Sequence, residues 1–180
     1  MVIDSQSMMF GEPPGARVTL LRAPLEGIRP AAGPGEWYAP ENDGTTGLAL
    51  LPGTVPGGLA CELVYDSGAV ARATAHLLVV SFAVPVEALP VFDDWYDSEH
   101  SPLLLNAPSW LRIRRLYAPQ APDGELNCYV LHELADLEVL TGPDRDAATR
   151  GPKRAVVAEQ AWYATSRRWR FTPYGAGPRA

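Results

Sequence analysis

Nine residues near the middle of the chain combine acids, aromatic rings and one of the three histidines. The segment FDDWYDSEH runs from Phe92 to His100. In a helix, Asp93 and Asp97 lie before His100 on the same side, and the helix end adds a partial negative charge. These charges favour the protonated imidazole and raise its pKa, whereas burial lowers it. The spacing predicts a catalytic set in which His100 is the acid or base, Asp97 orients it and Tyr96 donates a hydrogen bond to a developing oxyanion.

A structural interpretation of the same segment stays open. An acidic helix face can end in a histidine that only complements the negative helix C-terminus. Trp95 then belongs to the core or to an interface, whereas in the catalytic interpretation it lines the substrate site. The two interpretations differ in whether His100 faces a cavity or solvent.

Arg115 and the strand after it supply further candidate residues. Arg115 shares its strand face with apolar residues, so it must pair with an acid such as Glu99 or Asp97, or bind an anionic ligand. Tyr129 and His132 are three residues apart in a predicted strand and therefore lie on opposite faces, so only one of them can join a cavity with His100. The candidate substrate-binding residues are Arg115, Trp95, Glu99, Tyr129 and His132.

Residues 75–175 alternate between strand and helix patterns. Short apolar runs rich in Val and Phe predict strands, and apolar residues three and four positions apart predict helices. Pro102 is expected to stop or kink the first helix near Ser101. The order is β-α-β-β-α-β, which is typical of an α+β ferredoxin-like sheet with both helices on one face. Strands are expected at 75–85, 110–119, 125–134 and 161–174, and helical stretches at 86–100 and 135–159.

Residues 1–70 are rich in Gly and Pro, which interrupt regular elements, and short strands are expected only in ARVTLLRAP and GLACELVYDS. WYAPEN (37–42) and WYDSEH (95–100) share W-Y-x-x-E, and Asn42 stands in the place of His100. The likeness predicts that this loop-rich region is a degenerate half-barrel repeat, which would make the chain an intrachain pseudo-dimer. Chance similarity is the alternative, because Trp162 begins a third Trp-Tyr pair outside the pattern.

Composition and charge exclude several classes of function. The 180 residues have a formal net charge of −6, which argues against a nucleic-acid partner. Cys61 and Cys128 show no metal-ligand spacing and are expected to be buried free thiols. The longest apolar run, Leu77 to Val84, is too short to span a membrane, and the N-terminus lacks the pattern of a secretory signal. These features predict a cytoplasmic protein with a small-molecule substrate, no metal and no membrane partner.

The stretch from Phe92 to Pro119 combines three patterns. It carries F-x-x-W-Y-x-x-E-H-x-P, a Pro-Ser-Trp turn and an R-x-R-R strand, and NCYVLHEL follows. In this combination the chain resembles the EthD-like group of the dimeric α/β barrel superfamily, although Ser109 stands where that group usually has Gly. The matching residues are Phe92, Trp95, Tyr96, Glu99, His100, Pro102, Pro108, Trp110, Arg112, Arg114 and Arg115.

The resemblance covers roughly residues 75–175 and implies an EthD-type domain there. In this superfamily two ferredoxin-like sheets face each other as a barrel with the helices outside, so the resemblance implies a homodimer or, with the faint repeat, an intrachain pseudo-dimer. Members include polyketide cyclases, cofactor-free monooxygenases, dehydratases and lactone isomerases, and also proteins without known activity. Many use a His or Tyr in an apolar pocket.

Three functions are compatible with these residues. The leading hypothesis is a cofactor-independent enzyme of the cyclase, dehydratase or isomerase type, in which His100 transfers protons on an apolar, aromatic or polyketide-like substrate. The alternative is a non-catalytic ligand-binding or assembly module on the same barrel. A third hypothesis is a haem-binding barrel with His100 or His132 as axial ligand, or a cofactor-free monooxygenase. Fold analogy does not select among them.

Overall fold

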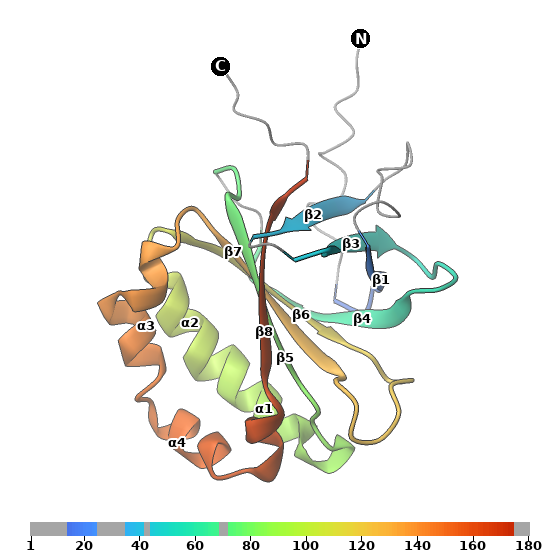
Figure 1. Ribbon diagram of the computed structural model, residues 1–180. Coiled ribbons are helices and arrows are strands. Elements are labelled where there is room, and N and C mark those ends of the chain that lie inside the picture. Colours follow the sequence, from blue (N-terminus) through green and yellow to red (C-terminus); the bar gives the residue numbers. More distant parts are fainter. Residues whose placement is uncertain (1–13, 25–34, 42–43, 69–71, 175–180) are drawn as a thin grey trace.

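Eight antiparallel strands close into a barrel, and the helices lie on one side of it (Figure 1). The computed structural model describes residues 14–24, 35–41, 44–68 and 72–174. Around the barrel the strands follow the order β1-β3-β2-β8-β5-β7-β6-β4. Their bounds are β1 Arg17–Pro24, β2 Glu36–Pro40, β3 Thr46–Pro52, β4 Leu59–Asp66, β5 His76–Phe82, β6 Trp110–Tyr117, β7 Cys128–Leu134 and β8 Arg167–Pro173.

The second half of the chain forms the predicted ferredoxin-like unit. Its four strands stand in the order β8-β5-β7-β6, and both helical segments cover the same face of that sheet (Figure 1). The predicted last strand began too early, because Ala161–Thr165 forms a 3₁₀ turn and β8 begins only at Arg167. The helical elements are η1 Val86–Ala88, α1 Leu89–Trp95, η2 Tyr96–His100, α2 Ser101–Leu105, η3 Glu138–Thr141, α3 Pro143–Ala148, α4 Pro152–Ala158 and η4 Ala161–Thr165.

A π turn lies in the middle of the first helical segment. α1, η2 and α2 follow one another without a break, so Pro102 does not stop the helix, and of the two expected outcomes only an irregularity next to Ser101, the π turn, is present. The Ser101 amide donates to the carbonyl of Tyr96, five residues earlier. Pro102 has no amide hydrogen to donate to the preceding turn, and it lies directly after the π turn, at the start of α2. The π turn contains His100, and such turns are frequent at functional sites.

The first half of the chain contributes four strands and completes the barrel. Its strand order, β4-β1-β3-β2, is the same as the order in the second half. The sequence patterns predicted β1 and β4 and missed β2 and β3. Trp37 and Tyr38 lie on β2, whereas Trp95 and Tyr96 are helical, so the two Trp-Tyr motifs are not structurally equivalent. Asn42 lies outside the described residues, and the descent of residues 1–70 from a repeat stays a prediction.

Alternation along the central strand β5 builds two separate cores. Leu77 and Val79 point into the barrel, where they pack with apolar residues of both halves of the chain. Val80 and Phe82 point to the other face and pack under the helices. Burial on both faces explains why this strand is a nearly continuous apolar run. The layer between sheet and helices holds the candidate site.

Buried ion pairs join the two halves inside the barrel. Arg114 on β6 binds Glu36 on β2 through two hydrogen bonds of 2.8 and 2.6 Å, and it also contacts Glu133 on β7 at 2.8 Å. Arg112 pairs with Asp66 on β4 in the same way. Each arginine therefore has carboxylate partners on a strand of the other half. None of the described helices is long and apolar enough to cross a membrane.

Candidate functional site

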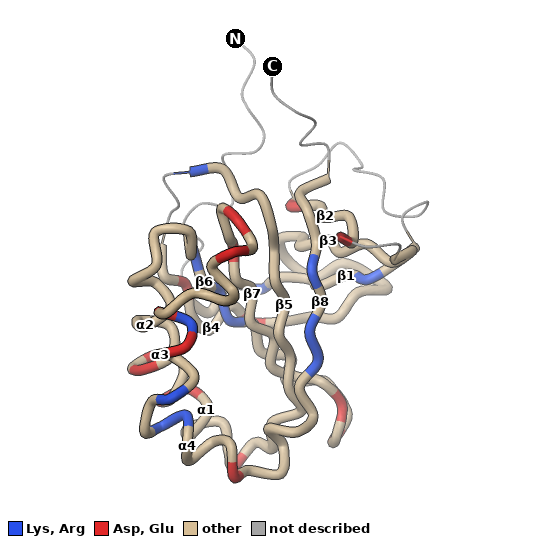
Figure 2. The backbone as a smooth tube through the Cα atoms, turned by 60° about the vertical axis from the view of Figure 1, so that its left-hand side comes forward, with Lys and Arg blue, Asp and Glu red and all other residues tan. Residues whose placement is uncertain are grey.

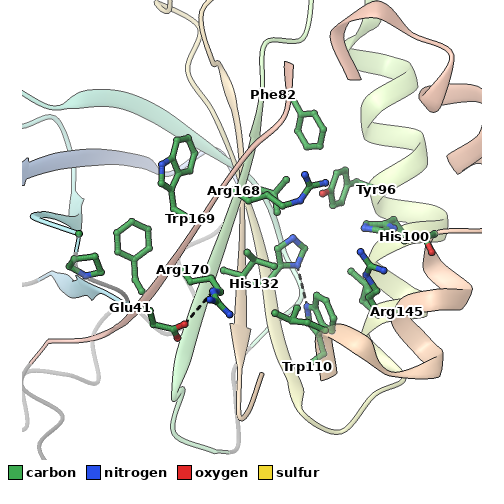
Figure 3. A pocket seen from close by; sticks show the side chains of 18 of the residues that line it. Glu41, Phe82, Tyr96, His100, Trp110, His132, Arg145, Arg168, Trp169 and Arg170 are labelled. Carbon is green, nitrogen blue, oxygen red and sulfur yellow. Dashed lines mark hydrogen bonds and ion pairs between the residues drawn. The ribbon is translucent and has the colours of Figure 1, made fainter. Parts of the chain in front are cut away.

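A cavity of about 740 Å³ lies between the helices and the sheet face formed by β5, β7 and β8, and it extends past β8 to residues of the first half of the chain on β1, β2 and β3. His100 lines it, so this histidine faces a cavity rather than open solvent. Figure 3 shows Tyr96 and His100 extending from the helical side and His132 and Arg168 from the sheet side. Apolar and aromatic residues make up much of the wall: Leu78, Val80, Phe82, Trp95, Leu104, Trp110, Leu140, Tyr163, Trp169 and Phe171.

His100 is held as a neutral imidazole. Its ring stacks 4.7 Å from the ring of Trp95 and meets the ring of Tyr96 edge-on at 5.0 Å. Burial lowers the pKa of His100 from 6.5 to about 4, so of the two opposing effects expected from the sequence, burial is the larger. Its Nδ1 lies 3.0 Å from the carbonyl of Ala148 on α3. A carbonyl only accepts hydrogen bonds, so Nδ1 carries the proton and Nε2 keeps its lone pair.

His132 has the opposite tautomer. The indole of Trp110 donates from Nε1 to Nδ1 of His132 at 3.1 Å, so the neutral ring carries its proton on Nε2. Burial lowers the pKa of His132 to about 3, and the nearby charges of His100 and Arg168 act in the same direction. The cavity therefore combines one imidazole that can accept a proton with another that can donate a hydrogen bond.

Tyr96 is a second donor in the cavity. It is only 1% exposed, and burial raises the pKa of its hydroxyl well above 10, so the group stays protonated. Figure 3 shows the ring of Tyr96 extending toward Arg168 of β8. Tyr96 thus remains where the sequence placed it, beside His100.

Four of the predicted site residues have structural contacts away from the cavity. Asp97 does not orient His100, because the π turn directs it to Arg115 at 2.8 Å. Arg115 also binds Asp93 at 2.6 Å, which confirms the predicted ion pair with an acid and leaves Arg115 outside the cavity wall. Glu99 accepts hydrogen bonds from two backbone amides at the start of α4. Tyr129 packs in the barrel core, on the face opposite to His132.

The basic residues of the cavity were not predicted from the sequence. Five arginines line it, from β1, α3, α4 and β8, and Glu41 is the only acid in its described wall. The alternation in RRWRF could have indicated the two β8 residues. It places Arg168 and Arg170 on the same face of the strand, and this is the face that the helices cover. The five are Arg22, Arg145, Arg154, Arg168 and Arg170.

Clusters of metal-ligating side chains are absent from the described part of the chain. No group of three or more His, Cys, Asp or Glu side chains comes together there. Cys61 and Cys128 are buried free thiols, as the sequence predicted, and burial raises the pKa of each to about 12.

Solved structures with the same fold span almost the whole chain. A monooxygenase-like protein from Listeria innocua matches with a TM-score of 0.62 at 12% identity, covering 91% of this chain and 96% of its own. A ferredoxin-fold protein from Listeria monocytogenes, related to antibiotic biosynthesis monooxygenases, matches at 0.59 and 14%, covering 93% and 98%. A haem-degrading enzyme from the same species matches at 0.58 and 12%, covering 87% and 98%.

Sequence comparison gives no family. No protein-family model and no curated protein matches the chain. The structural matches are nevertheless consistent across nearly the full length of both partners. The chain therefore has the ferredoxin-like α/β barrel fold of the monooxygenase-like and haem-degrading proteins, closed within a single chain.

Proposed function

We propose that the protein is a cofactor-independent enzyme that removes a proton from an aromatic or polyketide-like small molecule, with His100 as general base. The observation that carries this proposal is the imidazole of His100 in the cavity, with its Nδ1–H bound to the carbonyl of Ala148. This bond fixes the ring and leaves the lone pair of Nε2 as the proton acceptor. Because the pKa of His100 is about 4, the base is present at neutral pH without a preceding deprotonation.

The proposed step moves one proton. It leaves an acidic C–H or O–H of the substrate for Nε2 of His100, and the bonding electrons stay on the substrate as an enolate or phenolate. Tyr96 and the Nε2–H of His132 are protonated donors in the same cavity, so they are suited to stabilise the new oxyanion. Return of the proton to another atom of the substrate completes an isomerisation. Loss of a β-hydroxyl, which takes up the proton and leaves as water, completes a dehydration. Attack of the enolate carbon on a carbonyl of the same molecule, whose oxygen takes the proton, completes a cyclisation.

The assignment to the EthD-like group belongs to this proposal. It rests on the segment from Phe92 to Pro102, which forms the π-containing helix of the cavity. The division into residues 1–70 and an EthD-type domain at 75–175 rests on the same resemblance.

Proton exchange on a model ketone tests the proposal without knowledge of the natural substrate. We expect the protein to accelerate deuterium exchange at the α-carbon of 2-tetralone or at C10 of anthrone in D₂O, followed by NMR. His100→Ala should slow the catalysed exchange by about 100-fold or more, the usual contribution of a general base. His76→Ala, which removes a histidine outside the cavity wall, is the control. Equal exchange by His100→Ala and wild type would show that His100 is not the base.

Haem binding is the second candidate, because one structural neighbour degrades haem and the donor set fits an axial ligand. His100 is neutral, and its Nδ1–H···O=C bond is the usual arrangement of a metal-bound histidine. Nε2 of His100 would hold the iron, the arginines would hold the propionates, and haem would supply redox chemistry with O₂. Titration with Fe(III) protoporphyrin IX decides between the two: a saturable Soret band that His100→Ala removes and His76→Ala keeps would favour haem.

A further inference from the structure

The geometry points to a substrate that carries a carboxylate on its aromatic body, with the carboxylate bound between Arg168 and the pair Arg145 and Arg154. This inference deepens the proposed function and depends on the same cavity. It identifies a substrate class, the aromatic acids, and it makes Arg168 a specificity-determining residue.

The first support is the pairing of the arginines elsewhere in the molecule. Each of the three buried arginines of β6 contacts at least one carboxylate at 2.8 Å or less. In the cavity, by contrast, no carboxylate of the described residues pairs with the guanidinium of Arg154 or Arg168. Arg154 stacks over the ring of Tyr163 at 4.2 Å, and the exposed side chain of Arg168 donates a hydrogen bond to the hydroxyl of Ser166 at 3.5 Å. Among the described residues, no carboxylate therefore neutralises the guanidiniums of Arg154 and Arg168, whereas Arg145 has the carboxylate of Asp146 at 3.8 Å.

The second support is where these cations lie relative to the histidines. Arg145 and Arg154 come from the helical side and act on the charge of His100, and Arg168 comes from β8 and acts on His132 and Tyr96. Figure 2 shows the blue segments of β8 and of α4 on opposite sides of the layer between strands and helices. An anionic group in the cavity is thus attracted from both sides and lies next to the proposed base.

The third support is the contrast between the cavity and the whole chain. The protein has a formal net charge of −6, but the described cavity wall has five arginines and one glutamate. That glutamate, Glu41, already contacts Arg170 at 3.4 Å and His76. A cleft of one sign with apolar walls concentrates ligands of the opposite charge. Its aromatic rings accept a flat apolar body, and its guanidiniums match the planar shape of a carboxylate.

A matched pair of probes tests the inference. Isothermal titration compares 2-naphthoate with the uncharged 2-naphthamide, which has nearly the same shape. Wild type should bind the naphthoate at least about tenfold more tightly, equivalent to ~1.4 kcal/mol. Arg168→Gln should reduce this ratio to below about threefold, and added NaCl should lower it in wild type because the site is partly open to solvent. Arg167→Gln, which alters the neighbouring exposed arginine outside the cavity wall, should keep the wild-type ratio.

Two results would overturn the inference: equal binding of both probes by wild type, or an unchanged ratio in Arg168→Gln. Arg168→Lys keeps the positive charge and should retain part of the preference for naphthoate. It tests the inference even if the glutamine variant does not fold. His100→Ala should keep the preference for naphthoate while it loses proton exchange. If wild type prefers naphthoate but exchanges no ketone proton, the proposed reaction fails and the anion site stands. If wild type exchanges the ketone proton but binds both probes equally, the anion site fails and the proposed reaction stands.

Discussion

The low pKa of His100 predicts the pH dependence of the reaction. A base with a pKa of about 4 is half protonated at that pH and almost fully deprotonated above pH 5. The kcat/KM for ketone exchange should therefore be flat from pH 5 to 8 and fall at lower pH, with a midpoint near 4. Asp97→Asn should keep both the midpoint and the rate, because Asp97 binds Arg115 rather than His100. A pH series of exchange rates checks both expectations. A midpoint near pH 6.5 would contradict the buried neutral His100. A midpoint that shifts in Asp97→Asn would mean that Asp97 interacts with His100 after all.

His132 makes folding stability depend on pH. Its pKa is 6.5 when it is free of the fold and about 3 in the folded protein, so only the unfolded chain takes up this proton between those values. Stability therefore falls as the pH is lowered, by about 2 kcal/mol from pH 7 to pH 5 for this one group. His132→Gln keeps an acceptor for Trp110 and removes the titration. Urea unfolding at both pH values should show a smaller loss in the variant, and equal losses would contradict the buried neutral imidazole.

At the residue scale, strand periodicity was the reliable guide. It placed Tyr129 and His132 on opposite faces, and it required an acid for Arg115, both as observed. Helical periodicity misplaced Asp97 relative to His100, because the π turn adds a residue to one turn and changes the relative direction of the side chains. The burial of His100, which decides the direction of its pKa shift, depends on α3 and α4. A local pattern contains no information about that packing.

At the element scale, Glu99 acts as a cap for another helix. α4 begins at Pro152 after Gly151, which has no capping side chain, and the carboxylate of Glu99 accepts from the amides of Lys153 and Arg154 at 3.0 and 2.8 Å. Glu99→Ala should lower the free energy of unfolding by about 1 kcal/mol, as for a lost N-cap. Urea unfolding measures this change.

Gly151 gives this prediction a built-in control. A Cβ at position 151 would lie 2.3 Å from the Glu99 carboxylate, so Gly151→Ala should also destabilise the protein while Glu99 is present. In Glu99→Ala/Gly151→Ala the clash is gone, and the double variant should lose less than the sum of the single losses. Additive losses would mean that Glu99 and Gly151 are not in contact.

The elements of residues 75–175 could be predicted because β5 is an apolar run, β6 and β8 alternate in side-chain type, and Gly or Pro follows β5 and β6. β2 and β3 escaped prediction because Gly and Pro surround both of them, and β2 has only five residues. Their stability comes from pairing with β1 and β8, which are distant in the sequence. The α3 and α4 boundaries followed from Gly-Pro pairs, since proline is well suited to the first turn of a helix.

At the scale of the whole molecule, the barrel is closed within one chain, and this affects both the need for a second chain and the way the two halves fold. The inner faces of both sheet halves already pack against each other in one core, so a second chain is not needed to cover them. The two halves are also joined by charge. Burial alone would raise the pKa of Glu36, but the charge and hydrogen bonds of Arg114 hold it below its usual 4.5. The link from β2 to β6 is therefore an ionised pair at neutral pH.

Glu36→Gln should lower the unfolding free energy of both halves of the chain together. It leaves the buried guanidinium of Arg114 with Glu133 as its remaining ion-pair partner, which should lower the free energy of unfolding by about 3 kcal/mol in a single transition. Because the pKa of Glu36 is lowered by folding, its contribution is present above pH 4.5 and disappears as the carboxylate is protonated at lower pH. The difference in unfolding free energy between wild type and variant should therefore become smaller as the pH falls below 4.5.

Glu62→Gln, an exposed change on β4, is the control. The measurement is urea unfolding followed by both circular dichroism and tryptophan fluorescence. Two separate transitions, or a loss no larger than in the control, would mean that the halves fold independently and that Arg114 does not couple them.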